Sequence, residues 1–404
     1  MIFNLGEIKN RDMTKIVSLF SMGNFINYKT FTQEGMQRFD CSGYLTLKIL
    51  PPFYSGIKKI NCSGCVNLEE IPELPEDLEE LNCSGCESLM RLPKLPPNLK
   101  YLNCSGCLKL KEIPELPETL DDFYCNGCYE LEYLPDIPPL IDQLFCFNCT
   151  SLKSLPKIPY GLKGLFCFGC FNLESLPVLP DTIKEISCSK CYNLKYISGL
   201  PEGLLIFTCD KCTSLKRIDR LPSTVMEFFC GGCIVLEEIP ELPEGLVEIR
   251  CCNCEYIERL PKLPSSLKKL LCYGCKRLQE IPVLPDGLLK LDFSRCIILR
   301  AHPVLPSGLA EVSCFSCPYL ISDDSRITYQ ISVIDNLERY NRLKAHINAE
   351  EAKLWISLCM AQRCPLSSAN VLCTDILRHI KDIYCKENYQ CIRYTDIMIK
   401  MAYT

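Results

Sequence analysis

The chain has 404 residues, of which 48% are hydrophobic and 23% charged, and its formal net charge is −5. An acidic balance of this kind argues against a protein that binds nucleic acid by neutralising phosphates, which needs clustered lysine and arginine. No stretch approaches the eighteen or so consecutive apolar residues of a membrane span, and the first residues lack the basic-then-apolar layout of a secretory signal. We therefore expect a soluble, intracellular protein in a reducing compartment: the cytoplasm, or a host's cytoplasm if the source is viral or an effector.

Residues 1–40 contain a mixed apolar stretch, MTKIVSLFSMGNFINYKTF, and precede the first copy of a repeat that fills the middle of the chain. The end coils of stacked repeats have to be covered. We expect residues 1–40 to form an N-terminal cap.

The repeat is 21 residues long and occupies residues 41–320. Its first cysteine returns at every twenty-first position from Cys41 to Cys314, with Phe293 in its place once, so about 14 repeats follow one another without insertion or deletion. A fixed period in this range indicates a stacked solenoid. The copy LNCSGCESLMRLPKLP shows the shared features, which are regularly spaced leucines, a second cysteine three residues after the first, and an LPxLP ending.

Each copy contains one short strand and one return segment. Leu81 and Cys83 alternate with Glu80, Asn82 and Ser84, as expected for a strand with one buried side. The return contains prolines, which lack an N–H and fix φ, so it is neither a helix interior nor a central strand. We expect a parallel sheet on the concave face and an extended, polyproline-like convex side.

The consensus LxxLxCxxCxLxxLPxLPxx resembles the leucine-rich repeat, with cysteine in the last strand position and again in the asparagine position. The LPxLP half is similar to the repeats of bacterial secreted effectors and plant immune receptors. The resemblance implies an α/β repeat fold, a leucine-rich-repeat solenoid, over residues 41–320.

The 32 cysteines allow three interpretations. Pairs such as Cys104 and Cys107 have the C-x-x-C spacing of zinc ligands, and cysteines one strand apart are close enough for disulfides. The favoured interpretation is packing, because the spacing follows the leucines in every copy. On this view the first thiol is a small buried hydrophobe and the second replaces the asparagine. We expect free thiols, no metal and no cofactor.

Aromatic residues gather in the columns on either side of the first cysteine. The early copies carry asparagine before that cysteine and serine after it, whereas the middle copies carry large rings. Stacking alone would explain such rings, but an exposed group of them indicates an interaction site. The candidate partner-binding residues are Tyr124, Phe145, Phe147, Phe166, Phe168 and Phe229.

Residues 321–404 lack the repeat and show apolar spacings typical of helices, as in NAEEAKLWISLCMAQ. We expect a helical C-terminal cap or small domain. The bacterial effectors with LPxLP repeats often carry a ubiquitin-ligase domain with a Cys-x-Asp motif, and Cys373-Thr374-Asp375 matches these letters. The tail is much shorter than that domain, and His379 is the only base we can name beside it, so helix packing is the preferred explanation of Cys373.

The sequence therefore predicts a scaffold that binds a partner protein on its concave face, not an enzyme, a nucleic-acid binder or a membrane protein. No phosphate-binding loop, nucleophile elbow or H-E-x-x-H motif is present. The alternatives are a ligase that uses Cys373 and a metal-binding cysteine-rich scaffold. Neither the partner's identity nor the oligomeric state can be predicted from the sequence.

Overall fold

The computed structural model describes residues 37–53, 55–301, 303–314 and 317. The chain divides after Gly245 into two compact units, and each is described by itself. The expected helical C-terminal segment, residues 321–404, lies outside the described residues, as does nearly all of the expected N-terminal cap.

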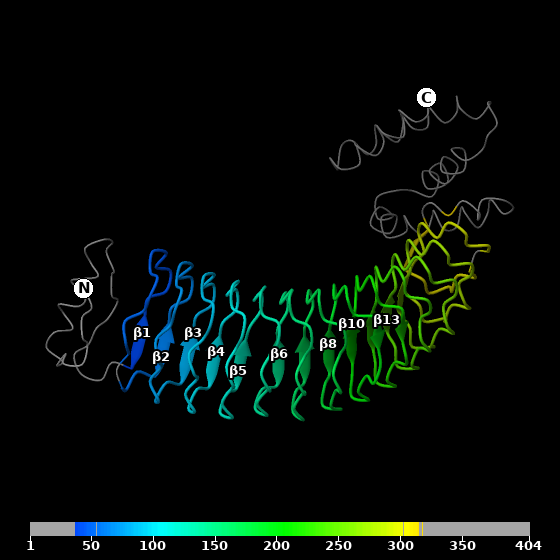
Figure 1. The fold of residues 1–404 in the computed structure, drawn as a ribbon. Helices are drawn as coiled ribbons and strands as arrows, with labels where there is room; N and C mark the ends of the chain where they lie inside the picture. Colours follow the sequence, from blue (N-terminus) through cyan, green and yellow to red (C-terminus); the bar gives the residue numbers. More distant parts are fainter. Residues whose placement is uncertain (1–36, 54, 302, 315–316, 318–404) are drawn as a thin grey trace, which may run out of the picture. The chain divides into compact units, whose positions relative to one another are not determined.

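The first unit is a stack of coils, each contributing one three-residue strand to a parallel sheet (Figure 1). Successive strands pair in register 21 residues apart, as with Leu81 and Leu102. The sheet strands are β1 (Arg38–Asp40), β2 (Lys59–Asn61), β3 (Glu80–Asn82), β4 (Tyr101–Asn103), β5 (Asp122–Tyr124), β6 (Gln143–Phe145), β7 (Gly164–Phe166), β8 (Glu185–Ser187), β10 (Ile206–Thr208) and β12 (Glu227–Phe229). The predicted parallel solenoid is confirmed.

The second unit repeats the same coil. Its strands are β13 (Glu248–Arg250), β14 (Lys269–Leu271), β15 (Lys290–Asp292) and β16 (Glu311–Ser313), again parallel and in the same register. In both units the strand precedes the first cysteine of the copy. The strand of the first coil, β1, therefore lies within residues 1–40, three residues before the start expected for the solenoid.

The core is a set of columns that run through the coils of each unit. The middle residue of every three-residue strand is buried, as in Leu81 and Leu102, and so is the first cysteine of every described coil except Cys314, as in Cys83 and Cys104. Phe293 stands in the cysteine column of the second unit and is also fully buried. A position that accepts either cysteine or phenylalanine in the core is a packing position, as the sequence predicted.

The second cysteine of most copies has a polar role in addition to being buried. Its thiol donates a hydrogen bond to the backbone carbonyl of the first cysteine one coil earlier, as from Cys107 Sγ to Cys83 O at 3.2 Å. Twelve such contacts between 3.0 and 3.3 Å occur in the described residues, and in the last of them Cys317 donates to the carbonyl of Phe293, which stands in the cysteine column. The thiol therefore satisfies part of the backbone of the neighbouring coil, the role predicted for a replacement of asparagine.

This contact predicts a difference between two substitutions at one position. Cys107→Ala removes the donor and leaves a small void, so we expect it to lower the free energy of unfolding by about 1–2 kcal/mol. Cys107→Ser keeps a donor and should cost less. Urea denaturation followed by far-UV circular dichroism measures both. If serine destabilises as much as alanine or more, the thiol acts only as an apolar filler.

The return segments contain no helix in the described residues, in agreement with the predicted extended side. One feature of the returns was not predicted. In two neighbouring coils they pair as a second, two-stranded parallel sheet, β9 (Tyr196–Ile197) with β11 (Arg217–Ile218). Elsewhere the described returns make only isolated bridges, such as Ile49 with Glu70.

A tight turn follows each first cysteine and places the residue two positions later at positive φ. Glycine occupies this place in most coils, for example Gly64 and Gly85 at φ 71°. Five coils use other residues there, which are Asn148, Lys190, Lys211, Asn253 and Arg295, all with φ of 57–60°. A side chain in this conformation costs about 1 kcal/mol relative to glycine. The glycine in the repeat is therefore a turn residue and not part of a phosphate-binding loop.

Candidate partner-binding surface

Three of the predicted aromatic residues form one continuous stack on the exposed side of the sheet. They occupy the last position of β5, β6 and β7, just before the buried cysteine. The ring centroids of Tyr124 and Phe145 lie 5.6 Å apart, and those of Phe145 and Phe166 4.9 Å apart, with the latter pair only 7° from parallel. All three side chains are partly exposed. We call this stack and the pair described next the aromatic ladder.

The second part of the ladder lies just after the buried cysteine. Phe147 and Phe168 stack with centroids 4.5 Å apart and planes within 6°. They flank the same cysteines as Phe145 and Phe166, because residues on either side of a buried strand position face the same way. Five rings from three consecutive coils are thus gathered on one face.

Gly164 makes room for the ring of Phe166 at the start of β7. A Cβ placed on Gly164 would lie 2.7 Å from a ring carbon of Phe166, closer than carbon atoms can approach. Most other coils carry a long polar side chain at this strand position. Because Gly164 has no side chain, the Phe166 ring can occupy the space above the start of β7.

The structure adds one ring that sequence reasoning missed and separates one that it included. Tyr101, on β4, packs against Tyr124 at 5.9 Å with a tilt of 49°, which extends the ladder by a coil. Tyr101 is the first residue of its strand, whereas Tyr124, Phe145 and Phe166 are the last residues of theirs. A search limited to the positions next to the first cysteine therefore does not find Tyr101. Phe229 lies at the end of β12, and Ser187 and Thr208 stand between it and Phe166 in the same column. Phe229 is therefore not part of the ladder.

Other exposed apolar groups follow the same period. Phe171 and Tyr192 stack at 4.7 Å on the turn after the second cysteine. Leu205 and Met226, just before β10 and β12, are 37% and 46% exposed. The 21-residue spacing within each pair could have revealed both from the sequence.

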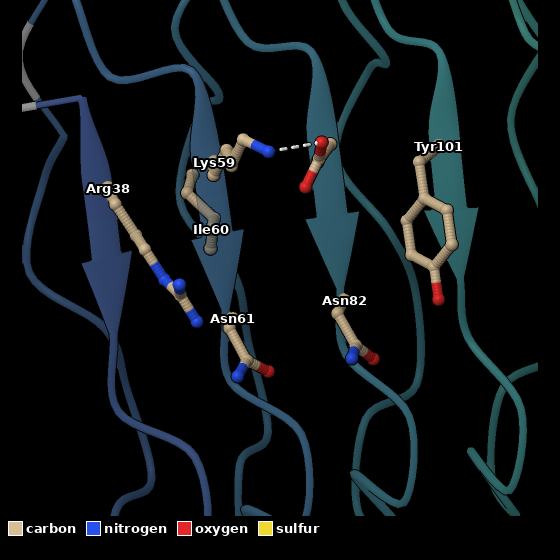
Figure 2. A pocket seen from close by; sticks show the side chains of 7 residues that line it. Arg38, Lys59, Ile60, Asn61, Asn82 and Tyr101 are labelled. Carbon is tan, nitrogen blue, oxygen red and sulfur yellow. Dashed lines mark hydrogen bonds and ion pairs between the residues drawn. The ribbon is translucent and has the colours of Figure 1, made fainter.

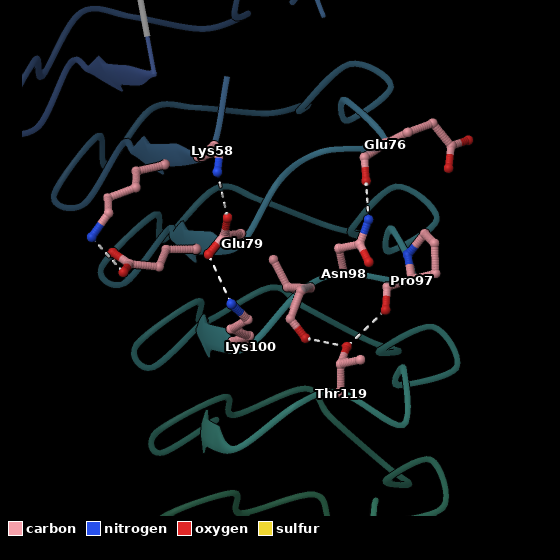
Figure 3. Close-up of polar contacts among 10 residues, drawn as sticks. Lys58, Glu76, Glu79, Pro97, Asn98, Lys100 and Thr119 are labelled. Carbon is pink, nitrogen blue, oxygen red and sulfur yellow. Dashed lines mark hydrogen bonds and ion pairs between the residues drawn. The ribbon is translucent and has the colours of Figure 1, made fainter. Parts of the chain in front are cut away.

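Ion pairs between neighbouring coils occupy part of the exposed face. Glu79 lies between Lys58 and Lys100, with N–O distances of 3.0 and 2.9 Å (Figure 3). These two ammonium groups lower the pKa of Glu79 to about 2. Lys59 and Glu80 pair in the next column at 2.6 Å. The alternating lysine and glutamate of the sequence are thus a mutually neutralised surface over β2–β4.

The acidic residues beside the ladder differ from Glu79 and Glu80 in their ion pairing. Asp121 and Asp122, before and at the start of β5, are exposed and form no ion pair within the described part of the chain. The Tyr124 hydroxyl donates to Asp122 at 3.4 Å. Partial burial, together with the Asp122 carboxylate and Tyr101, raises the pKa of Tyr124. The aromatic ladder therefore has an acidic border at β5.

A hollow of about 230 Å³ lies on the exposed face of β1–β4 (Figure 2). It is lined mainly by polar side chains, which are Arg38, Lys59, Asn61, Glu80, Asn82 and Tyr101, together with Ile60. Sites for small molecules usually measure about 300–1,000 Å³ and are mostly apolar. The hollow is smaller than such sites, and at Tyr101 it borders the ladder.

The cysteine columns do not provide ligand clusters in the described residues. No three histidine, cysteine, aspartate or glutamate side chains among them are arranged to hold a metal ion. None of the 27 cysteines in this part of the chain is drawn in a disulfide bond, and 26 of them are buried. Cys373 lies outside it. Within the described residues, no helix has the length and apolar character to cross a membrane.

Comparisons with known proteins give the following similarities. No family model matches the chain, and neither does any curated protein. Among solved structures, YopM from Yersinia enterocolitica is 23% identical over 66% of this chain, with a TM-score of 0.47. A leucine-rich repeat protein from Bacteroides ovatus is 19% identical over 74%, with a TM-score of 0.45. YopM from Yersinia pestis, a leucine-rich effector protein, is 23% identical over 69%, with a TM-score of 0.40.

This chain spans 61% of the first of these structures, 86% of the second and 89% of the third. Its own coils have the 21-residue period, the single strand and the buried leucine columns of the consensus. The fold is that of a leucine-rich-repeat solenoid. The resemblance inferred from the repeat consensus is confirmed in this respect.

Proposed function

We propose that the solenoid is a protein-interaction module that binds a partner protein on the exposed face of its sheet, at the aromatic ladder over β5–β7. The observation that carries the proposal is the gathering of partly exposed rings from three consecutive coils. Protein-binding surfaces are enriched in such side chains, and a few of them usually supply most of the binding energy.

The fold itself does not require these rings. The position of Tyr124, Phe145 and Phe166 is held by asparagine in β2, β3 and β4, and by serine or threonine in β8 and β10. Those strands pair in the same parallel register as β6 and β7. Stacking stabilises each ring pair by about 0.5–1.5 kcal/mol, but the coils form equally without it. A partner that covers the rings accounts for aromatic residues at solvent-facing positions.

We also propose that the solenoid acts by binding and not by catalysis, in a reducing compartment. The reducing compartment is proposed because the second cysteines donate from their thiols to backbone carbonyls, a role that only reduced cysteines can fill. A ligase that uses Cys373 and a metal-loaded scaffold are the alternatives. Nothing in the described residues favours either.

Affinity capture with a triple substitution tests the proposed surface. Phe145→Ser, Phe166→Ser and Phe168→Ser introduce a residue type already found in both columns, so the fold should persist. The protein would be immobilised under reducing conditions and offered a lysate of the cells in which it occurs. We expect a partner retained by the wild type to be lost from the variant, with at least a hundredfold weaker binding.

A matched control removes three exposed rings outside the sheet face: Tyr129→Ser, Tyr133→Ser and Tyr160→Ser. These side chains are 49%, 56% and 78% exposed. The control should retain the partner, and circular dichroism should show all three proteins equally folded. If the ladder variant captures the same proteins as the wild type, or if the control loses them as well, the ladder is a stacking feature and not the binding surface.

A further inference from the structure

We infer that the partner segment on the aromatic ladder carries a positively charged side chain, an arginine, placed over the β5 border of the ladder. The inference rests on the proposed function and specifies the chemistry of the partner. It follows from the way charges are paired along the exposed face.

Several charges on this face are neutralised by the neighbouring coil. In the column four residues before the first cysteine, Lys58 and Lys100 both pair with Glu79 (Figure 3). Further along the same column Lys163 pairs with Asp142, with an N–O distance of 3.4 Å. Residues 21 apart are neighbours in the sheet, so alternating signs in one column satisfy one another.

Among the described residues of this column in the first unit, Asp121 is the acidic residue that forms no ion pair, and Lys184, which donates to the carbonyl of Gly203, is a basic one. The surroundings of Asp121 explain its lack of an ion pair. Its neighbours are Lys100 on one side and Asp142 on the other, and each of these pairs with a different residue. Asp121 is thus left beside a like charge, an arrangement that destabilises a sheet. Asp122 stands in the next column between Tyr101 and Gln143, neither of which carries a positive charge. Two exposed carboxylates therefore lack a cation at the edge of the ladder.

A bound arginine would interact favourably with both the carboxylates and the aromatic rings of this border. Its guanidinium donates paired hydrogen bonds to carboxylates. It also lies favourably on aromatic rings, and Tyr101 and Tyr124 stand beside the two aspartates. The chain already contains such a contact in its second unit, where Arg277 lies 4.5 Å from the centre of the Tyr256 ring. An acidic partner segment would instead meet two uncompensated negative charges.

Selection of peptides on the folded protein tests this inference. A phage-displayed library of random short peptides would be selected on the wild-type chain under reducing conditions. Clones would be kept only if they fail to bind the variant with serine at 145, 166 and 168. We expect these clones to be enriched in arginine next to an apolar residue, and their binding to weaken as salt is raised.

Charge variants of the protein then separate the two proposals. Asp121→Asn with Asp122→Asn should weaken the selected peptides about ten- to a hundredfold. The matched control, Glu237→Gln with Glu238→Gln, removes the same charge from exposed residues outside the sheet face and should have no effect. Asp121→Lys with Asp122→Lys should shift a new selection from basic to acidic peptides.

The outcomes are distinguishable. Peptides that need the ladder but bind the asparagine variant normally would overturn the inference and leave the proposed function standing. Ladder-dependent peptides that show no enrichment in arginine or lysine would also overturn the inference and leave the proposed function standing. A selection in which no clone depends on the ladder would overturn both. Basic peptides lost from the asparagine variant, and retained by the glutamine control, would support both.

Discussion

Raising the pH from about 8 to about 10 under reducing conditions is expected to unfold the solenoid. The cause is the column of first cysteines. Hydrogen bonding to the thiol of the next coil's second cysteine, together with burial, raises the pKa of Cys62, Cys83 and Cys146 well above the ordinary value. Cys125, Cys167, Cys188 and Cys272 are raised for the same reasons.

The sign of the effect follows from proton binding. In the folded chain these thiols keep their protons, whereas in the unfolded chain they ionise with a pKa of about 8.5. Above that pH the unfolded state binds fewer protons than the folded state, so stability falls as pH rises. Each such thiol subtracts about 1.4 kcal/mol per pH unit. Several acting together remove a typical stability of about 5–15 kcal/mol within one or two units.

Urea denaturation at a series of pH values measures this slope directly. The triple variant Cys62→Ala, Cys83→Ala and Cys146→Ala should be less stable at neutral pH, yet its stability should fall less steeply with pH, by about 4 kcal/mol per unit. The slope, and not the absolute stability, is the test. A wild-type protein whose stability is constant between about pH 8 and 10 would contradict the buried, protonated state of these thiols.

Replacing Phe207 by alanine is the single substitution with the largest expected effect on stability. Phe207 and Phe228 occupy the middle of neighbouring strands β10 and β12, are fully buried, and stack at 5.7 Å with planes within 5°. Removing one ring leaves a cavity that the rigid coils on either side cannot close. We expect a loss of about 3–5 kcal/mol in the free energy of unfolding.

Phe207→Leu is the matched control, because leucine or isoleucine fills this position in most other coils. It should cost less than about 1.5 kcal/mol. Denaturation by urea, followed by far-UV circular dichroism, compares the two. In a solenoid each coil contacts only its neighbours, so the alanine variant should also broaden or split the transition. Equal stability of the alanine and leucine variants would contradict close packing at this position.

The two units differ little in the chemistry of their coils, yet they expose different surfaces. The ladder belongs to the first unit alone. In the second unit Glu248 is buried and pairs with Arg250 at 2.6 Å and Lys269 at 2.8 Å. Its neighbours lower the pKa of Glu248 despite the opposing effect of burial. The two units therefore differ in the residues of their surface columns and not in the coil itself.

The sequence by itself determined the repeat and its interior. Because each residue position recurs every 21 residues and meets its own copy in the next coil, the buried columns of Leu81 and Cys83 could be assigned from spacing alone. The same logic placed Tyr124, Phe145 and Phe166 on one face. It could also have separated Phe229, since Ser187 and Thr208 intervene by simple counting.

Only the tertiary structure decided what depends on distances between coils. The Cys107 thiol reaches a carbonyl 24 residues earlier and not 21, which no column alignment reveals. Tyr101 joins the ladder from a different column because its ring tilts toward Tyr124. Lys100 pairs with Glu79 and leaves Asp121 without a cation, although both acids are its neighbours. Periodicity fixes which residues are adjacent, but side-chain reach and competition among neighbours fix which of them interact.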